Sequence, residues 1–195
     1  MTEALSTFVR PGFLPDDECA AWCAEMDQAP RQTGAVRDPD QPDTDRVEPV
    51  DRRAFDCDVS DETTRSIVER VARVAPEVAG HFAMALTQSE VPHFVRYEPG
   101  GFYRPHRDIY VDLVLPEPLA SRRVSVVVFL NDDFAGGVLR LCSHEAGAFE
   151  SRNAIDVASE PGLLVAFRAD TWHEVTPITH GVRSTIVTLL HAPRR

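Results

Sequence analysis

Three side chains in the second half of the chain could together hold a metal ion. His106 and Asp108 are two positions apart, and residues with this spacing in an extended strand point to the same face. His173 follows much further along the chain, before Glu174 and Val175. Two histidines and one carboxylate, with the other coordination positions open, are typical ligands of a mononuclear non-haem Fe(II) centre. We therefore expect His106, Asp108 and His173 to be metal ligands and catalytic residues.

The open positions of such a centre could take a bidentate 2-oxo acid and O₂. A 2-oxo diacid has a second carboxylate that must be neutralised, and the planar fork of an arginine pairs with a carboxylate through two hydrogen bonds. Arg183 lies in an apolar segment, where an unpaired charge would be costly. We expect Arg183 to bind that carboxylate. Thr185, two residues further on, shares its face and could add a hydroxyl donor.

Short strands separated by turn residues must position these side chains. Segments rich in β-branched residues and bounded by Gly, Pro, Asn and Asp predict strands at 93–97, 102–110, 123–130, 138–141, 163–167 and 185–190. Many short strands of this kind favour a β-sandwich or a jelly roll.

The N-terminal part predicts two helices instead. One begins near Pro15, with three acidic residues in its first turn, and runs to about Gln28. The other begins after Ser60, a suitable N-cap, and ends near 85–87, with Pro76 expected to kink or split it. Its apolar residues form one stripe that indicates core packing: Ile67, Val71, Val74 and Val78.

Residues 29–53, between the two helices, contain four prolines among polar residues and show no hydrophobic period. We predict a loop, which is either a solvated connector or a lid over a substrate. The 195 residues are read as a single domain. It is mainly β with N-terminal helices: residues 1–90 supply the helices and the loop, and residues 91–195 form the catalytic jelly roll.

Composition narrows the classes of function and partner. A net charge of −11 argues against a nucleic-acid partner, which would need a basic face. No apolar run is long enough to cross a membrane, and the first residues lack the pattern of a signal peptide. The four cysteines show no CxxC spacing, so we expect a reducing, cytoplasmic environment. The protein could form a homodimer, which the composition does not decide.

A wider motif surrounds the predicted metal ligands. It comprises Tyr97-x-x-Gly100-x-x-Tyr103-x-x-His106-x-Asp108, then Phe129-Leu130-Asn131-Asp132, Gly136-Gly137, and His173-Glu174-Val175 with Pro177, Gly181 and Arg183. The early segment Phe13-Leu14-Pro15-Asp16-Asp17-Glu18-Cys19 belongs to the same pattern. In combination these segments resemble the iron- and 2-oxoglutarate-dependent dioxygenases of the prolyl 4-hydroxylase alpha-subunit type. The resemblance is strong over 94–190 and weak over 29–90.

This resemblance implies a double-stranded β-helix, a cupin-like jelly-roll barrel backed by the N-terminal helices. It implies Fe(II) on His106, Asp108 and His173, and 2-oxoglutarate on Arg183 with Tyr97 as a hydrogen-bond donor. The implied reaction is hydroxylation of an unactivated C–H bond with release of succinate and CO₂. Ascorbate would rescue oxidised iron.

Two departures from the family pattern bear on the substrate. Phe129 stands where some members carry a tyrosine for the far carboxylate, and residues 109–122 show no counterpart of the family's peptide-binding loops. A free amino acid, a small peptide or a biosynthetic intermediate is therefore as consistent with the sequence as the protein prolyl substrate of a prolyl 4-hydroxylase. Arg122 and Arg168 are candidates for binding a substrate carboxylate.

Two other functions use the same residues. Two histidines and an aspartate can also hold zinc, which would make the domain a zinc-binding module or a hydrolase. An inactive jelly roll that binds a ligand or a partner is the second alternative. Arg183 and the Gly136-Gly137 hairpin argue against the zinc hydrolase, and the intact metal ligands argue against the inactive fold.

Overall fold

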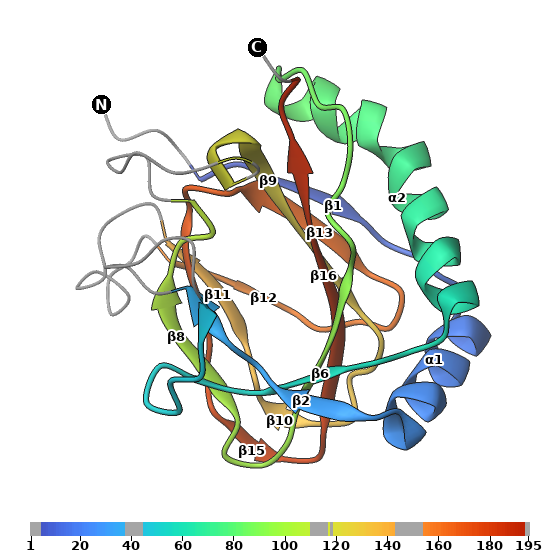
Figure 1. Cartoon of the computed structure of the whole chain (residues 1–195), viewed down its shortest axis with the longest axis vertical. Coiled ribbons are helices and arrows are strands. Elements are labelled where there is room, and N and C mark those ends of the chain that lie inside the picture. The colour runs from blue at the N-terminus through green and yellow to red at the C-terminus, as the bar shows by residue number, and fades with distance from the viewer. Residues whose placement is uncertain (1–4, 38–44, 110–116, 118, 143–153, 194–195) are drawn as a thin grey trace.

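The computed structural model describes residues 5–37, 45–109, 117, 119–142 and 154–193. Over these residues the protein is mainly β, with two larger sheets and two α-helices that lie together on one side (Figure 1). No helix in the described part of the chain is long and apolar enough to cross a membrane.

The larger sheet has seven strands and forms one wall of the molecule. In spatial order it contains β1 (Thr7–Arg10), β13 (Leu164–Arg168), β9 (Arg122–Phe129), β16 (Arg183–His191), β7 (His93–Tyr97), β6 (Phe55–Cys57) and β2 (Arg31–Thr33). All neighbours in this sheet are antiparallel. The two longest strands, β9 and β16, are adjacent at its centre and are almost entirely buried.

The second sheet has five antiparallel strands. It contains β12 (Ala154–Val157), β11 (Leu139–Cys142), β14 (Trp172–Val175), β8 (Phe102–His106) and β5 (Arg52–Arg53). Two short pairs complete the strands: β10 (Ala135–Gly136) with β15 (Ile178–His180), and β3 (Val36–Arg37) with β4 (Asp45–Arg46). A 3₁₀ turn, η1 (Leu119–Ser121), leads into β9.

Strand β9 shows how the sequence pattern builds two cores. Successive side chains alternate between the faces of a sheet. Val124, Val126 and Val128 pack in the cluster that contains the helices, whereas Val127 and Phe129 pack against residues of the five-stranded sheet. A strand that is apolar at nearly every position is required here, because both of its faces are covered.

The two helices cover the outer face of the seven-stranded sheet. α1 (Asp16–Gln28) matches its predicted range, and in α2 (Asp61–Phe82) the Ser60 hydroxyl accepts a hydrogen bond from the Thr63 amide, as expected of an N-cap. Pro76 does not split α2, and the helix ends earlier than predicted, at the left-handed residue Ala83 (φ 51°). The predicted stripe is buried against the sheet: Ile67, Val71, Val74 and Val78.

The prediction of a strandless loop at 29–53 is wrong for the described part of that segment. β2 pairs with β6 at the edge of one sheet, and β5 pairs with β8 at the edge of the other. Strands of two or three residues are too short to show a hydrophobic period, which explains why the sequence did not reveal them. Residues 38–44, within the segment predicted to be a connector or a lid, and residues 110–116 and 118, within the region compared with peptide-binding loops, lie outside the described residues.

Candidate metal and cosubstrate site

His106, Asp108 and His173 are brought together by the register of two strands. His106, the last residue of β8, is paired with His173 of β14, and Asp108 follows two residues after β8 ends. Nε2 of His106 is 3.9 Å from Oδ1 of Asp108, and Nε2 of His173 is 3.6 Å from Oδ2. One ligand atom from each residue lies within 4.8 Å of the others. Atoms that share a metal at about 2 Å lie about 3–4 Å apart, so the cluster has the dimensions of a metal site.

The two histidines present the correct nitrogen for a metal. Nδ1 of His106 lies 2.8 Å from the carbonyl oxygen of Arg104, and Nδ1 of His173 lies 3.0 Å from that of Thr171. A carbonyl oxygen only accepts, so each Nδ1 carries the hydrogen and each Nε2 keeps its lone pair for the metal. Burial and the neighbouring His173 lower the pKa of His106 to about 3, which keeps its ring neutral as a ligand must be.

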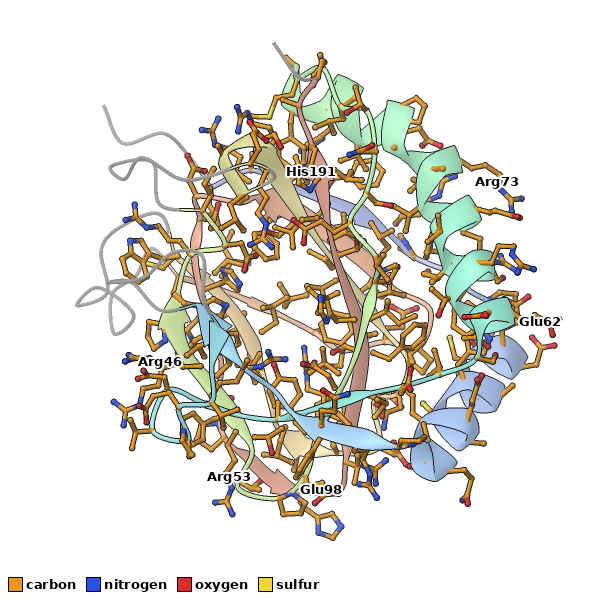
Figure 2. All side chains as sticks on the ribbon, in the orientation of Figure 1. Arg46, Arg53, Glu62, Arg73, Glu98 and His191 are labelled. Carbon is orange, nitrogen blue, oxygen red and sulfur yellow. The ribbon has the colours of Figure 1, made fainter. Side chains whose placement is uncertain are left out.

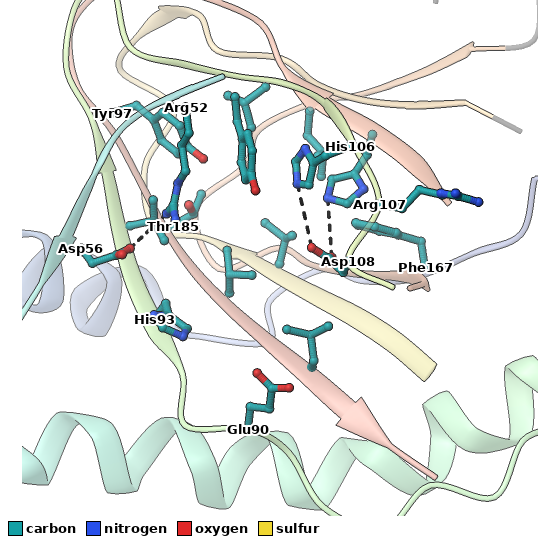
Figure 3. A pocket seen from close by; sticks show the side chains of 18 of the residues that line it. Arg52, Asp56, Glu90, His93, Tyr97, His106, Arg107, Asp108, Phe167 and Thr185 are labelled. Atoms are coloured by element: carbon teal, nitrogen blue, oxygen red, sulfur yellow. Dashed lines mark hydrogen bonds and ion pairs between the residues drawn. The ribbon is translucent and has the colours of Figure 1, made fainter. Parts of the chain in front are cut away.

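Asp108 is held in its ionised form. Burial by itself would raise the pKa of its carboxyl, but His173, His106 and the Ser125 hydroxyl together hold the pKa below its ordinary value. Ser125, on β9, donates to Oδ2 at 2.5 Å. The backbone amide of Asp108 donates to the carbonyl of Ala169 at 3.0 Å. Both contacts orient the carboxylate, and Figure 3 shows Asp108 joined by a dashed line to His106.

Arg183 is almost completely buried, at 1% exposure. Its guanidinium carbon lies 5.2 Å from the ring centre of Tyr97 and 5.1 Å from that of Phe129. NH1 donates to the Thr185 hydroxyl at 3.2 Å, but Nε and NH2 have no hydrogen-bond partner among the residues that the structure describes. Burial lowers the pKa of Arg183 to about 10, so it remains a cation at neutral pH. A buried cation with two unsatisfied nitrogens is costly unless an anion binds it, and a carboxylate of 2-oxoglutarate fits this requirement.

One cavity of about 270 Å³ joins these groups (Figure 3). The three predicted metal ligands, Arg183, Thr185 and Tyr97 all line it. Tyr97 and Arg183 face each other across β7 and β16, which pair at these two residues. The structure thus brings together every residue that was predicted to bind the metal or the cosubstrate.

The two arginines predicted to bind a substrate carboxylate have different positions. Arg122 lines the cavity, but Nε and NH2 donate to the two oxygens of Glu90 at 2.6 and 2.8 Å, and NH1 donates to the Asp108 carbonyl at 3.2 Å. His191 contacts the same carboxylate at 3.0 Å. Arg168 is not among the described residues that line the cavity, and it pairs with Asp170 at 2.8 Å.

Tyr103 is a cavity residue that sequence reasoning misplaced. Its odd spacing from His106 predicts the opposite face of the strand, yet the two rings stack with their centres 3.5 Å apart and their planes 16° apart. The register explains the difference: Tyr103 pairs with Val175 while His106 pairs with His173, so β8 has one extra residue between these pairs. Such a bulge reverses the alternation. No local signal other than Pro105 marks it in the sequence.

The fold and the buried His–Asp–His cluster define a candidate mononuclear metal centre in a mainly β protein. Residues 92–191 match the family model of the 2OG-Fe(II) oxygenase superfamily, and the chain belongs to this family. It is 31% identical over 103 residues to a PKHD-type hydroxylase of Sphingopyxis alaskensis (52% of this chain, 44% of that protein). It is 30% identical over 125 residues to a PKHD-type hydroxylase of Nitrobacter winogradskyi (60% and 49%). The chain spans about half the length of these relatives or less.

Solved structures show the same fold. A Pseudomonas putida prolyl-4-hydroxylase superposes with a TM-score of 0.70 at 23% identity, covering 97% of this chain and 94% of that one. A Trichoplax adhaerens prolyl hydroxylase, in complex with a hypoxia-inducible-factor peptide, gives 0.69 at 15% identity (95% and 83%). HygX of Streptomyces hygroscopicus, with nickel and 2-oxoglutarate bound, gives 0.67 at 13% identity (97% and 84%). The chain therefore shares the jelly-roll fold of these oxygenases.

Proposed function

We propose that the protein is an Fe(II)- and 2-oxoglutarate-dependent oxygenase that hydroxylates an unactivated C–H bond and releases succinate and CO₂. One observation carries the proposal: the cavity that holds the His–Asp–His cluster also holds a buried arginine, Arg183, with two unsatisfied nitrogens. A metal-binding module would need the cluster alone. An oxygenase that uses a 2-oxo diacid needs both features in one cavity.

Each residue has a stated role in this proposal. His106, Asp108 and His173 would hold Fe(II), which would supply the activation of O₂. Arg183 binds the far carboxylate, and Thr185 and Tyr97 add hydroxyl groups. Phe129 offers no hydroxyl at this point, and its ring instead lies against the Arg183 guanidinium. The apolar residues around the cavity exclude water: Val127, Leu139, Phe167 and Val187.

The proposed substrate is an amino acid, a small peptide or a biosynthetic intermediate. Protein prolyl 4-hydroxylation is the second candidate, and the likeness to the Pseudomonas putida prolyl-4-hydroxylase favours it. We also propose that the two large sheets form the double-stranded β-helix barrel, that the enzyme works in the cytoplasm, and that ascorbate restores oxidised iron. A zinc-binding or inactive module is the alternative that the following experiment excludes or supports.

The test is anaerobic addition of Fe(II) and then 2-oxoglutarate to the purified protein, with the visible spectrum recorded. We expect a metal-to-ligand charge-transfer band that requires both additions. His173→Ala should lose the band, and His180→Ala, which changes a histidine on β15 outside the cavity lining, should keep it. A wild-type protein that shows no band, and that binds Zn(II) instead, would contradict the proposed function.

A further inference from the structure

A second arginine enters the cavity from the edge of the five-stranded sheet. Arg52, on β5, lines the cavity, and its side chain is 12% exposed. The guanidinium lies close to both Gly34 and Tyr103: a Cβ at position 34 would be 2.7 Å from its Cζ, and the Tyr103 ring centre is 5.2 Å from Cζ. Only glycine at position 34 leaves space for the guanidinium in this position.

The hydrogen-bonding capacity of Arg52 is only partly used. NH1 donates to the carbonyl of Ala35 at 2.8 Å, and NH2 donates to one oxygen of Asp56 at 3.0 Å. Nε is buried and has no hydrogen-bond partner within the described part of the chain. A guanidinium has five N–H donors, and a buried donor without a partner costs free energy of folding. The ion pair with Asp56 therefore does not account for the Nε donor of Arg52, which is free to bind a ligand.

Arg52 is connected to the metal site through stacked rings. The guanidinium contacts Tyr103, and Tyr103 stacks on His106. Figure 3 shows Arg52 and Asp56 on the same side of the cavity as Tyr97, with His106 and Asp108 across from them. A ligand group bound by Arg52 would therefore lie inside the cavity that the predicted metal ligands also line.

The charges of the described cavity lining do not oppose an anionic substrate. Four arginines line the cavity (Arg52, Arg107, Arg122 and Arg183), against three acids (Asp56, Glu90 and Asp108). Arg107 extends away from Asp108 in Figure 3, so the other three arginines balance the three acids. A divalent metal and a doubly charged 2-oxo diacid also cancel each other. The cavity therefore has no excess of negative charge that would repel an anionic substrate, although the whole chain has a net charge of −11.

Arg52 is the arginine best placed to bind that anion. Arg183 is assigned to the cosubstrate, and Arg122 donates through all three nitrogens to Glu90 and Asp108. Arg107 packs over the Trp172 ring at 5.0 Å, and in Figure 3 its side chain extends away from Asp108.

We propose that Arg52 binds a carboxylate of the primary substrate, which places this substrate in the class of carboxylic acids such as free amino acids and their N-acyl derivatives. This inference rests on the proposed function. Arg52 would bridge two carboxylates, those of Asp56 and of the substrate, which is a common arrangement for a planar guanidinium with two donor edges.

The test uses matched acids and amides. The probes are the twenty free amino acids and their N-acetyl derivatives, each compared with its own primary carboxamide. Binding to the Fe(II)–2-oxoglutarate form is measured anaerobically from the change in the visible band, and substrate-stimulated succinate release is measured in air. We expect at least one acid to bind at least ~10-fold more tightly than its amide, the size of one charge-assisted hydrogen bond.

Two variants separate ligand binding from a structural role. Arg52→Gln should bring the acid-to-amide ratio close to one while changing the dissociation constant of 2-oxoglutarate less than about threefold. Gly34→Ala keeps the charge but displaces the guanidinium, so it should lower the same ratio even if Arg52→Gln does not fold. Arg53→Gln, which changes the neighbouring residue outside the cavity lining, is the matched control.

Three results would overturn the inference. In the first, no acid binds to the wild-type protein more tightly than its amide. In the second, the acid-to-amide affinity ratio of the wild type is kept in the folded variants. In the third, Arg52→Gln loses much of its affinity for 2-oxoglutarate. The last result would assign Arg52 to the cosubstrate. Each of these results can occur in a working oxygenase. A protein that is not an oxygenase is recognised separately, because the wild type would then show no charge-transfer band.

Discussion

Ser125 donates its hydroxyl hydrogen to Oδ2 of Asp108 at 2.5 Å, from a position on β9 that is completely buried. The contact joins a central strand of the large sheet to the carboxylate of the proposed metal site. Groups that orient a ligand in this way commonly change metal affinity 10- to 100-fold when they are removed. We predict that Ser125→Ala weakens Fe(II) binding by about that factor.

The measurement for Ser125→Ala is anaerobic titration with Fe(II) at saturating 2-oxoglutarate. Ser184→Ala, at another buried serine of the same sheet, is the matched control and should bind Fe(II) as the wild type does. Equal Fe(II) affinities for Ser125→Ala and the wild type would show that the hydroxyl does not orient the ligand.

Glu90 holds Arg122 through two hydrogen bonds, and Arg122 in turn donates to the Asp108 carbonyl. We predict that Glu90→Gln loosens this arrangement, because a neutral amide replaces the charged acceptor of both bonds. Fe(II) affinity should fall ~3- to 10-fold, and more 2-oxoglutarate should be consumed per turnover of a substrate. Glu77→Gln removes an exposed ion pair with Arg10 and should change neither quantity.

Arg183 is predicted to contribute most of the affinity for 2-oxoglutarate. Removing one partner of a buried charge pair costs about 2–5 kcal/mol, so Arg183→Gln should raise the dissociation constant of 2-oxoglutarate at least ~30-fold. The band intensity as a function of 2-oxoglutarate concentration provides the measurement. Arg168→Gln, which changes an arginine paired with Asp170 outside the cavity lining, is the control. An unchanged constant in Arg183→Gln would mean that another residue binds the far carboxylate.

Cys19 and Cys23 should be unreactive thiols in the folded protein. Burial, followed by the charge of the neighbouring thiol, raises the pKa of Cys19 to about 11, and burial raises the pKa of Cys23 to about 11 despite a hydrogen bond with Ser184. The thiolate is the reactive form. Alkylation by iodoacetamide at pH 8 should therefore be ~100-fold slower than in the unfolded chain, where the thiol pKa is about 9. Mass spectrometry measures the labelling, and similar rates for the folded and the unfolded protein would contradict the prediction.

The same two thiols affect stability at high pH. Their pKa is higher in the folded state than the ordinary thiol pKa of 9.0, so their contribution to folding is complete below pH 9 and is lost as the pH rises toward 11. A Cys19→Ala, Cys23→Ala variant should show a smaller loss of unfolding free energy between these values. The free energy is measured by urea denaturation at each pH.

The sequence alone identified the residues whose chemistry depends on short motifs. His106 and Asp108 are neighbours in the chain, and the family motif extends to His173 and Arg183, so the cluster could be predicted without knowing how the strands pair. The long central strands and the stripe of α2 were also predictable, because a buried strand or helix face repeats a simple apolar pattern over many residues.

Only the tertiary structure revealed the positions of Arg52, Tyr103 and Glu90 in the cavity lining. Arg52 reaches the cavity because β5 pairs with the edge strand β8, and a two-residue strand has no sequence period. Tyr103 faces the cavity because a bulge shifts the register of β8, and Glu90 meets Arg122 and His191 across long separations in the chain. Local sequence determines which residues can bind a metal and a 2-oxo diacid. Strand register and long-range contacts decide which charged groups surround those residues. Register and contacts depend on packing between segments far apart in the sequence, so local sequence does not determine them.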